Sequence, residues 1–170
     1  MEKTITNRVL NSKLISLDLE DFNADGRRVM FDLKDHLYQG MILREKEFRD
    51  SVSNHDWGRY ENAFVNIYCS ADAIVPSWAY MLVAVNLQPY ARLVVFGTTE
   101  DLEKAIFDEQ IKSLDFSQYD DAKIVIKGCS NSPVGEYGLV KITAKLRENA
   151  SSIMFGEPCS TVPIYKSKKL

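Results

Sequence analysis

Residues 63–97, AFVNIYCSADAIVPSWAYMLVAVNLQPYARLVVFG, contain two β-rich stretches separated by a longer apolar one. AFVNIYC and ARLVVFG predict buried strands, because β-branched and aromatic residues favour the extended conformation. Between them, Pro76 can occupy the first turn of a helix that runs to Leu87 and ends before Pro89. A strand, a helix and a strand in this order predict two parallel strands joined by a right-handed crossover.

A weak internal repeat relates this segment to the rest of the chain. With an offset of 59 residues, Phe48 matches Phe107, and one extra residue in the second copy places Cys69-Ser70 opposite Cys129-Ser130. Each copy predicts a helix, a strand, a helix and a strand, so the two copies predict a pseudo-twofold arrangement. In the second copy the predicted elements are a helix at 101–114, a strand at 122–129, a helix at 134–148 and a last strand at 151–156.

The N-terminal region predicts a β-hairpin, because the β-rich stretches KLISLDLEDF and RRVMFDL flank NADG, whose Asp-Gly pair favours a tight turn. With 170 residues and no low-complexity linker, the chain is interpreted as one domain over residues 1–170. The predicted fold class is α/β, with a mainly parallel sheet from two pseudo-repeated αβαβ halves. The predicted parts are the hairpin at 1–34, the first repeat at 40–97, the second repeat at 99–156 and a C-terminal tail at 157–170.

The composition is that of an ordered globular protein, with 45% hydrophobic and 11% aromatic residues. A formal net charge of −3 argues against a nucleic-acid-binding protein. The start, MEKTITNRVL, lacks the apolar core of a secretory signal, and the longest apolar run, 71–87, contains Asp72 and Pro76 and predicts a buried helix. We therefore expect a cytoplasmic protein that binds neither nucleic acid nor membranes. An unknown protein partner and the oligomeric state are left open.

The three cysteines, Cys69, Cys129 and Cys159, carry the strongest chemical signal. Three cysteines in a reducing compartment argue against a disulfide framework. Each ends or follows a predicted strand, so all three are expected at the carboxyl edge of the sheet, where open α/β folds place their ligands. A strand order of 2-1-3-4, counted from the strand at 63–69, would put the Cys69 and Cys129 strands side by side.

Three neighbouring thiolates predict a site for Zn²⁺ or for an iron–sulfur cluster. Asp72 and His36 are the first candidates for a fourth ligand, followed by Glu157 and His55. Each cysteine precedes a serine, which could donate a hydrogen bond to a thiolate or cap the next helix. The predicted cofactor-binding residues are therefore Ser70, Ser130 and Ser160.

Other functions stay open at this point. A single cysteine activated at a helix N-terminus could act as the nucleophile of a thiol enzyme. Alternatively, the crevice could hold a partner peptide or a small molecule in a binding or structural module. A cysteine at a strand end is also often a small buried hydrophobe.

Several long stretches carry a family resemblance: NRVLNSKLISLDLEDF, QGMILREKEFRD, NHDW, CSADAIVPSWAYMLV, LQPYA, VVFGT, DFSQYDDAKIVIKGCS and SIMFGEPCSTVP. Through them the chain resembles, over nearly its whole length, the bacterial family catalogued as domain of unknown function 2480. The resemblance implies a bacterial cytoplasmic protein without an established activity. Family members often lie near genes for iron–sulfur assembly, so the resemblance also implies a role accessory to cluster assembly or metal handling.

Overall fold

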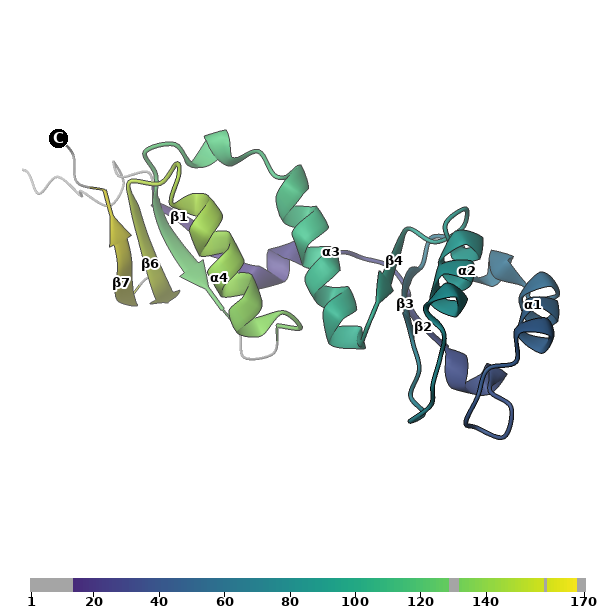
Figure 1. The fold of residues 1–170 in the computed structure, drawn as a ribbon. Helices are drawn as coiled ribbons and strands as arrows, with labels where there is room; N and C mark the ends of the chain where they lie inside the picture. The colour runs from purple at the N-terminus through teal and green to yellow at the C-terminus, as the bar shows by residue number, and fades with distance from the viewer. Residues whose placement is uncertain (1–13, 129–131, 158, 168–170) are drawn as a thin grey trace, which may run out of the picture. The chain divides into compact units, whose positions relative to one another are not determined.

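The computed structural model describes residues 14–128, 132–157 and 159–167. Within these ranges the strands form two sheets (Figure 1). The chain divides into two compact units, one of residues 24–106 and one of residues 1–23 together with 107–170. We call them the β3 unit and the β5 unit, after an interior strand of each sheet. The α/β class and the mostly parallel pairing are confirmed.

The β3 unit is built on a parallel sheet with the order β2-β3-β4. Two helices pack on one face of this sheet through a buried apolar cluster, and the first half of a third helix packs on the other face. The elements are β2 (Arg28–Asp32), α1 (Glu45–Ser53), β3 (Phe64–Tyr68), α2 (Ser77–Leu87), β4 (Leu93–Phe96) and α3 (Thr99–Ser113).

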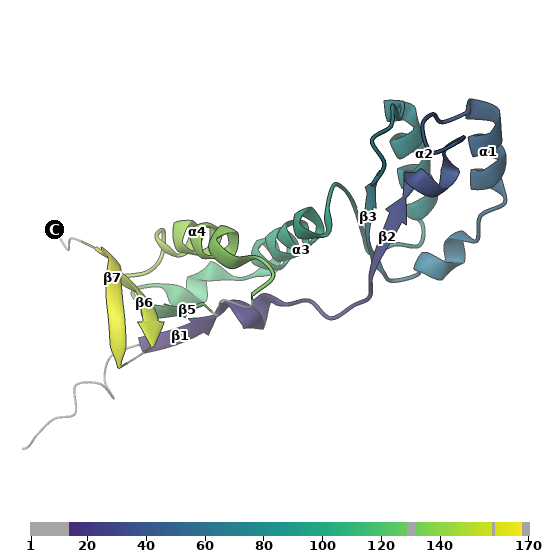
Figure 2. The same cartoon turned by 90° about the horizontal axis from the view of Figure 1, so that it is seen from below.

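The β5 unit has the order β1-β5-β6-β7, in which the last pair is antiparallel and the others are parallel (Figure 2). The second half of α3 and the helix α4 contribute Phe107, Ile111, Ile142 and Leu146 to the core against the sheet. The elements are β1 (Leu14–Asp18), β5 (Lys123–Lys127), α4 (Gly135–Leu146), β6 (Ser152–Glu157) and β7 (Ser160–Lys166).

Residues 59 positions apart occupy equivalent places in the two units. The turn before β3 contains Asn62 and the turn before β5 contains Asp121, and both residues have a φ of 56°. Asn and Asp adopt this left-handed conformation more readily than most residues. Equivalent buried positions are Val65 and Ile124, Ile67 and Ile126, Val83 and Ile142, and Leu87 and Leu146.

The predicted N-terminal hairpin is wrong. β1 pairs with β5 and β2 pairs with β3, both in parallel, so the two strands belong to different sheets. Between the two strands Asp18 caps the 3₁₀ helix η1 (Leu19–Phe22), which takes the place of the tight reversal that a hairpin needs. After β2, Asp32 caps a second 3₁₀ helix, η2 (Leu33–His36), in the same way.

The predicted single sheet with strand order 2-1-3-4 is also wrong. The strands before Cys69 and Cys129 are β3 and β5, and they lie in separate sheets. In each unit the two strands of one repeat pair with each other, and one of them also pairs with a strand from the N-terminal region. Neither sheet contains a strand of the other repeat. The assignment of residues 1–170 to one domain stays a prediction.

The segment predicted as a C-terminal tail contains the strand β7. It pairs with β6 so that Val162 lies opposite Phe155. Gly156, within β6, lets β7 lie close beside it, because its φ is +118° and a Cβ would lie 2.7 Å from the carbonyl oxygen of Ser160. The strand at 151–156 is therefore not the last strand of the fold.

No helix within the described ranges is long and apolar enough to cross a membrane.

Candidate functional site

The carboxylate of Asp32 binds the loop that follows the C-terminal end of β3. It accepts hydrogen bonds from the backbone N–H of Ser70 at 3.0 Å and from its hydroxyl at 2.6 Å. It also accepts the backbone N–H of Lys34 at 3.0 Å. Burial alone would raise the pKa of Asp32, but these hydrogen bonds and the charge of Lys34 lower it overall. The Ser70 hydroxyl thus holds β2 and the loop after β3 together.

Cys69 is half-buried and packs against the core of the β3 unit. Its Sγ donates a weak hydrogen bond to the carbonyl oxygen of Ala71, 3.6 Å away. Asp72 is exposed on the following loop. His36, the other first candidate for a fourth ligand, has its Nδ1 3.0 Å from the hydroxyl of Ser51 on α1.

The two cysteines that the structure describes, Cys69 and Cys159, belong to different units. Cys159 is exposed in the β5 unit, and Ser160 begins β7. Cys129 and Ser130 lie outside the described residues. Among the residues that are described, no three His, Cys, Asp or Glu side chains come together where they could hold a metal ion. The expected cluster of cysteines is therefore not found, and a role of single residues in Zn²⁺ or iron–sulfur binding stays a prediction.

Both histidines of the chain pack around the ring of Phe31. His36 stacks on this ring with centroids 5.3 Å apart, and His55 meets it edge-on at 5.6 Å. The Nε2 of His55 lies 3.2 Å from the hydroxyl of Tyr60. Burial lowers the pKa of His36 and of His55 below the usual 6.5, so both rings favour the neutral form.

These shifts predict a loss of stability in mild acid. Because the unfolded chain takes up the proton at its higher pKa of 6.5, the histidine contribution is complete above that pH. It is lost as the pH falls from 6.5 through the lower pKa of the folded state. His36→Phe introduces the residue found at the equivalent place after β1, which is Phe22. We expect this variant to lose less unfolding free energy than the wild-type protein between pH 7 and pH 5.

Urea titrations across this pH range measure the effect. Ser51→Ala is the control, because it removes the hydrogen-bond partner of His36 and keeps the titrating ring. Equal slopes for His36→Phe and wild-type protein would contradict the assignment.

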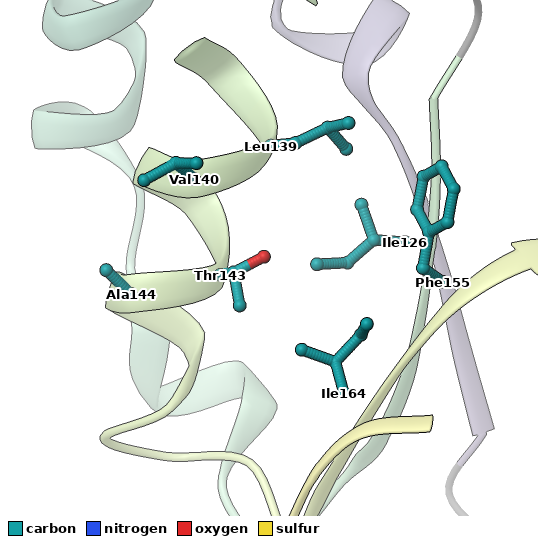
Figure 3. A pocket seen from close by; sticks show the side chains of 7 residues that line it. All are labelled: Ile126, Leu139, Val140, Thr143, Ala144, Phe155 and Ile164. Atoms are coloured by element: carbon teal, nitrogen blue, oxygen red, sulfur yellow. The ribbon is translucent and has the colours of Figure 1, made fainter. Parts of the chain in front are cut away.

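An apolar pocket of about 450 Å³ lies between α4 and the strands of the β5 unit. Figure 3 shows side chains of α4 on one side of the space and side chains from the strands on the other, with the Thr143 oxygen pointing toward Ile126. We call this space the α4 pocket. It is lined by Ile126 from β5, Leu139, Val140, Thr143 and Ala144 from α4, Phe155 from β6 and Ile164 from β7.

The position of α4 depends on a glycine at its contact with α3. A Cβ on Gly138 would lie 2.6 Å from Cγ2 of Val134 and 3.2 Å from Cζ of Phe107. The first distance, to the residue that caps α4 itself, is shorter than a carbon–carbon contact allows, and the second is tighter than most such contacts. Gly138 therefore lets α4 lie close to the ring of Phe107 on α3.

A second apolar pocket, of about 400 Å³, lies at the equivalent place in the β3 unit. We call it the α2 pocket. Val140 and Phe155 of the first pocket correspond to Met81 and Phe96 of the second. The full lining is Ile67 from β3, Ser77, Tyr80, Met81 and Ala84 from α2, and Val94 and Phe96 from β4.

The two pockets differ at the outer edge of the sheet. In the α4 pocket the edge is closed by β7, which contributes Ile164. In the β3 unit, β4 is an edge strand among the described residues, with no strand paired on its outer side. Sequence reasoning missed both pockets, although the offset of 59 residues pairs five of their positions: Ile67 with Ile126, Tyr80 with Leu139, Met81 with Val140, Ala84 with Thr143 and Phe96 with Phe155.

Comparison with protein families gives a match to proteins of unknown function, DUF2480, over residues 3–167. The chain belongs to this family. The matched residues span both units and include the lining of both pockets. Comparison with curated proteins and with solved structures gives no match.

Proposed function

We propose that the protein is a binding module whose α4 pocket accepts an apolar side chain of a partner protein. The observation that carries this proposal is the pocket together with its exposed apolar rim. Val140 is 69% exposed and Ile164 is 53% exposed. Well-packed pockets that take one large apolar side chain supply much of the binding energy at protein interfaces.

The chemistry of the lining supports binding. None of the seven lining side chains is titratable, and Thr143 supplies the hydroxyl. A pocket of several hundred Å³ with apolar walls and one polar group matches the general pattern of ligand sites. The exposed rim continues along β7 to Val162, which gives a partner surface apolar contact beyond the pocket itself.

Indole, the side chain of tryptophan, is a suitable probe. We expect it to cause saturable changes in the methyl NMR signals of Ile126, Leu139 and Val140. Ala144→Phe should lower the affinity for indole at least about tenfold, because the added ring occupies the pocket. The matched control is Lys145→Phe, which places the same ring at an exposed position of α4 outside the lining.

Two results would refute the proposal. In the first, indole perturbs methyl groups throughout the protein without preference for the α4 pocket. In the second, the Ala144→Phe and Lys145→Phe proteins bind indole equally.

A further inference from the structure

The outer face of α2 is apolar and exposed. Val83 and Leu87 are buried on the side facing the sheet. On the outer side Met81 is 66% exposed and Val85 is 71% exposed. Phe96, on β4 beside this helix, is 70% exposed. A helix that is apolar on both sides is expected to be covered on both sides, so this face requires a partner.

The free edge of β4 lies next to this apolar face. Residues 93–96, LVVF, contain no charged residue and no proline. At the equivalent side of the other sheet the edge strand is β7, which carries Pro163 and pairs with β6 through an irregular register. Proline and bulges are devices that protect exposed edges from pairing. β4 contains neither device, and within the described ranges no strand pairs with its outer edge.

In the β5 unit the equivalent edge is already paired with a strand. There β7 lies antiparallel to β6, pairs Val162 with Phe155 and closes the α4 pocket with Ile164. Phe96 on β4 is the equivalent of Phe155, and Val94 lies two residues before it on the same strand. If β4 pairs with the β4 of a second copy, Phe96 can therefore lie opposite a valine, as Phe155 lies opposite Val162.

We propose that a second copy of this chain pairs with β4 in an antiparallel, twofold-symmetric arrangement. In this register Phe96 lies opposite Val94 of the second copy, and Val95 lies at the axis. The helices α2 of the two copies then cover the same face of one continuous sheet. Met81, Val85 and Phe96 become buried, and the α2 pocket gains the strand that it lacks.

The charges that flank β4 favour a second copy in this direction. Arg92 precedes the strand, and Glu100 lies in the first turn of α3 after it. Within the chain Glu100 pairs with Lys104 at 2.7 Å, and Arg92 donates to the carbonyl oxygen of Asp25 at 3.2 Å. Antiparallel pairing brings the start of one strand to the end of the other, so Arg92 of one copy approaches Glu100 of the second. A twofold contact also needs a self-complementary surface, and this one offers both a pocket and protruding apolar side chains.

The mass of the full chain in solution tests the proposal. Light scattering with size exclusion should give about twice the chain mass of 19.4 kDa for the wild-type protein. Met81→Lys and Phe96→Lys should each give the monomer mass, because a buried unpaired charge opposes association. The matched control is Val140→Lys, at the equivalent and equally exposed position of α4, which should leave the dimer intact.

A monomeric wild-type protein, or a dimer that survives both lysine substitutions at α2 and β4, would overturn the proposal. Hydrogen exchange of the wild-type protein gives a check without any substitution, because β4 amides must exchange more slowly in the dimer than after dilution. This inference is independent of the proposed function, since Val140→Lys should weaken indole binding without changing the mass. Failure of one proposal is thus distinguishable from failure of the other.

Discussion

Leu87→Ala is expected to lower the free energy of unfolding by about 2–5 kcal/mol, the usual range for truncating a fully buried leucine. Leu87 is 0% exposed at the end of α2, and its equivalent Leu146 is 0% exposed at the end of α4. Leu146→Ala should cost a similar amount. The side chains belong to separate buried clusters, one in each unit. Denaturant titrations measure both losses.

The same two variants should destabilise different sets of strands. We expect Leu87→Ala to reduce hydrogen-exchange protection mainly in β2, β3 and β4, and Leu146→Ala mainly in β1, β5 and β6. Lys145→Ala, an exposed substitution next to Leu146, should change stability by less than about 0.5 kcal/mol. If both leucine variants loosened the same strands equally, the two buried clusters would not be separate cores.

Asp32→Ala is the second substitution with a large expected effect, a loss of about 2–3 kcal/mol. The side chain is 12% exposed, and its carboxylate caps η2 while it accepts two hydrogen bonds from Ser70. Removing it leaves the Ser70 donors and the start of η2 without their acceptor. Thermal and urea unfolding of the variant measure the loss.

The pH dependence of Asp32 has a definite sign. Its pKa is lower in the folded protein than the usual 3.8, so its stabilising contribution is complete above that value. The contribution is lost as the pH falls through the folded pKa. Asp72→Ala is the control, because Asp72 is an exposed carboxylate in the nearby loop. If Asp32→Ala cost no more than Asp72→Ala, the role assigned to Asp32 would be wrong.

Local patterns were enough to predict the strands and helices of the two repeats. Residues 63–97 form β3, α2 and β4, and the second copy forms α3, β5, α4 and β6. These elements depend on hydrophobic periodicity and on proline positions, which are properties of short segments. The mainly parallel pairing followed from their alternation along the chain.

Pairing between distant segments could not be predicted from the same patterns. β1 and β2 are adjacent in sequence but pair with β5 and β3, because each sheet needs a third parallel strand. One signal was available: Asp-Leu-x-Asp follows both strands, at Asp18 and at Asp32, and it marks them as equivalent parts of two units. A hairpin would have made them partners of each other.

The expected cysteine site depended on that long-range pairing. With β3 and β5 in one sheet, Cys69 and Cys129 would have been neighbours; in two sheets, this reason for their proximity disappears.

The pockets were missed for a different reason. They are formed by exposed apolar side chains such as Met81 and Val140, which in a sequence are indistinguishable from core residues.

In the β5 unit β7 pairs with the outer side of β6, and we propose that a second chain pairs with the equivalent side of β4 in the β3 unit. The most direct measurement is an isotope-filtered NMR experiment on a mixture of labelled and unlabelled protein. We expect contacts between the ring of Phe96 in one copy and the methyl groups of Val94 in the other. Intermolecular contacts that arise only from other strands, or their complete absence at concentrations used for NMR, would contradict it.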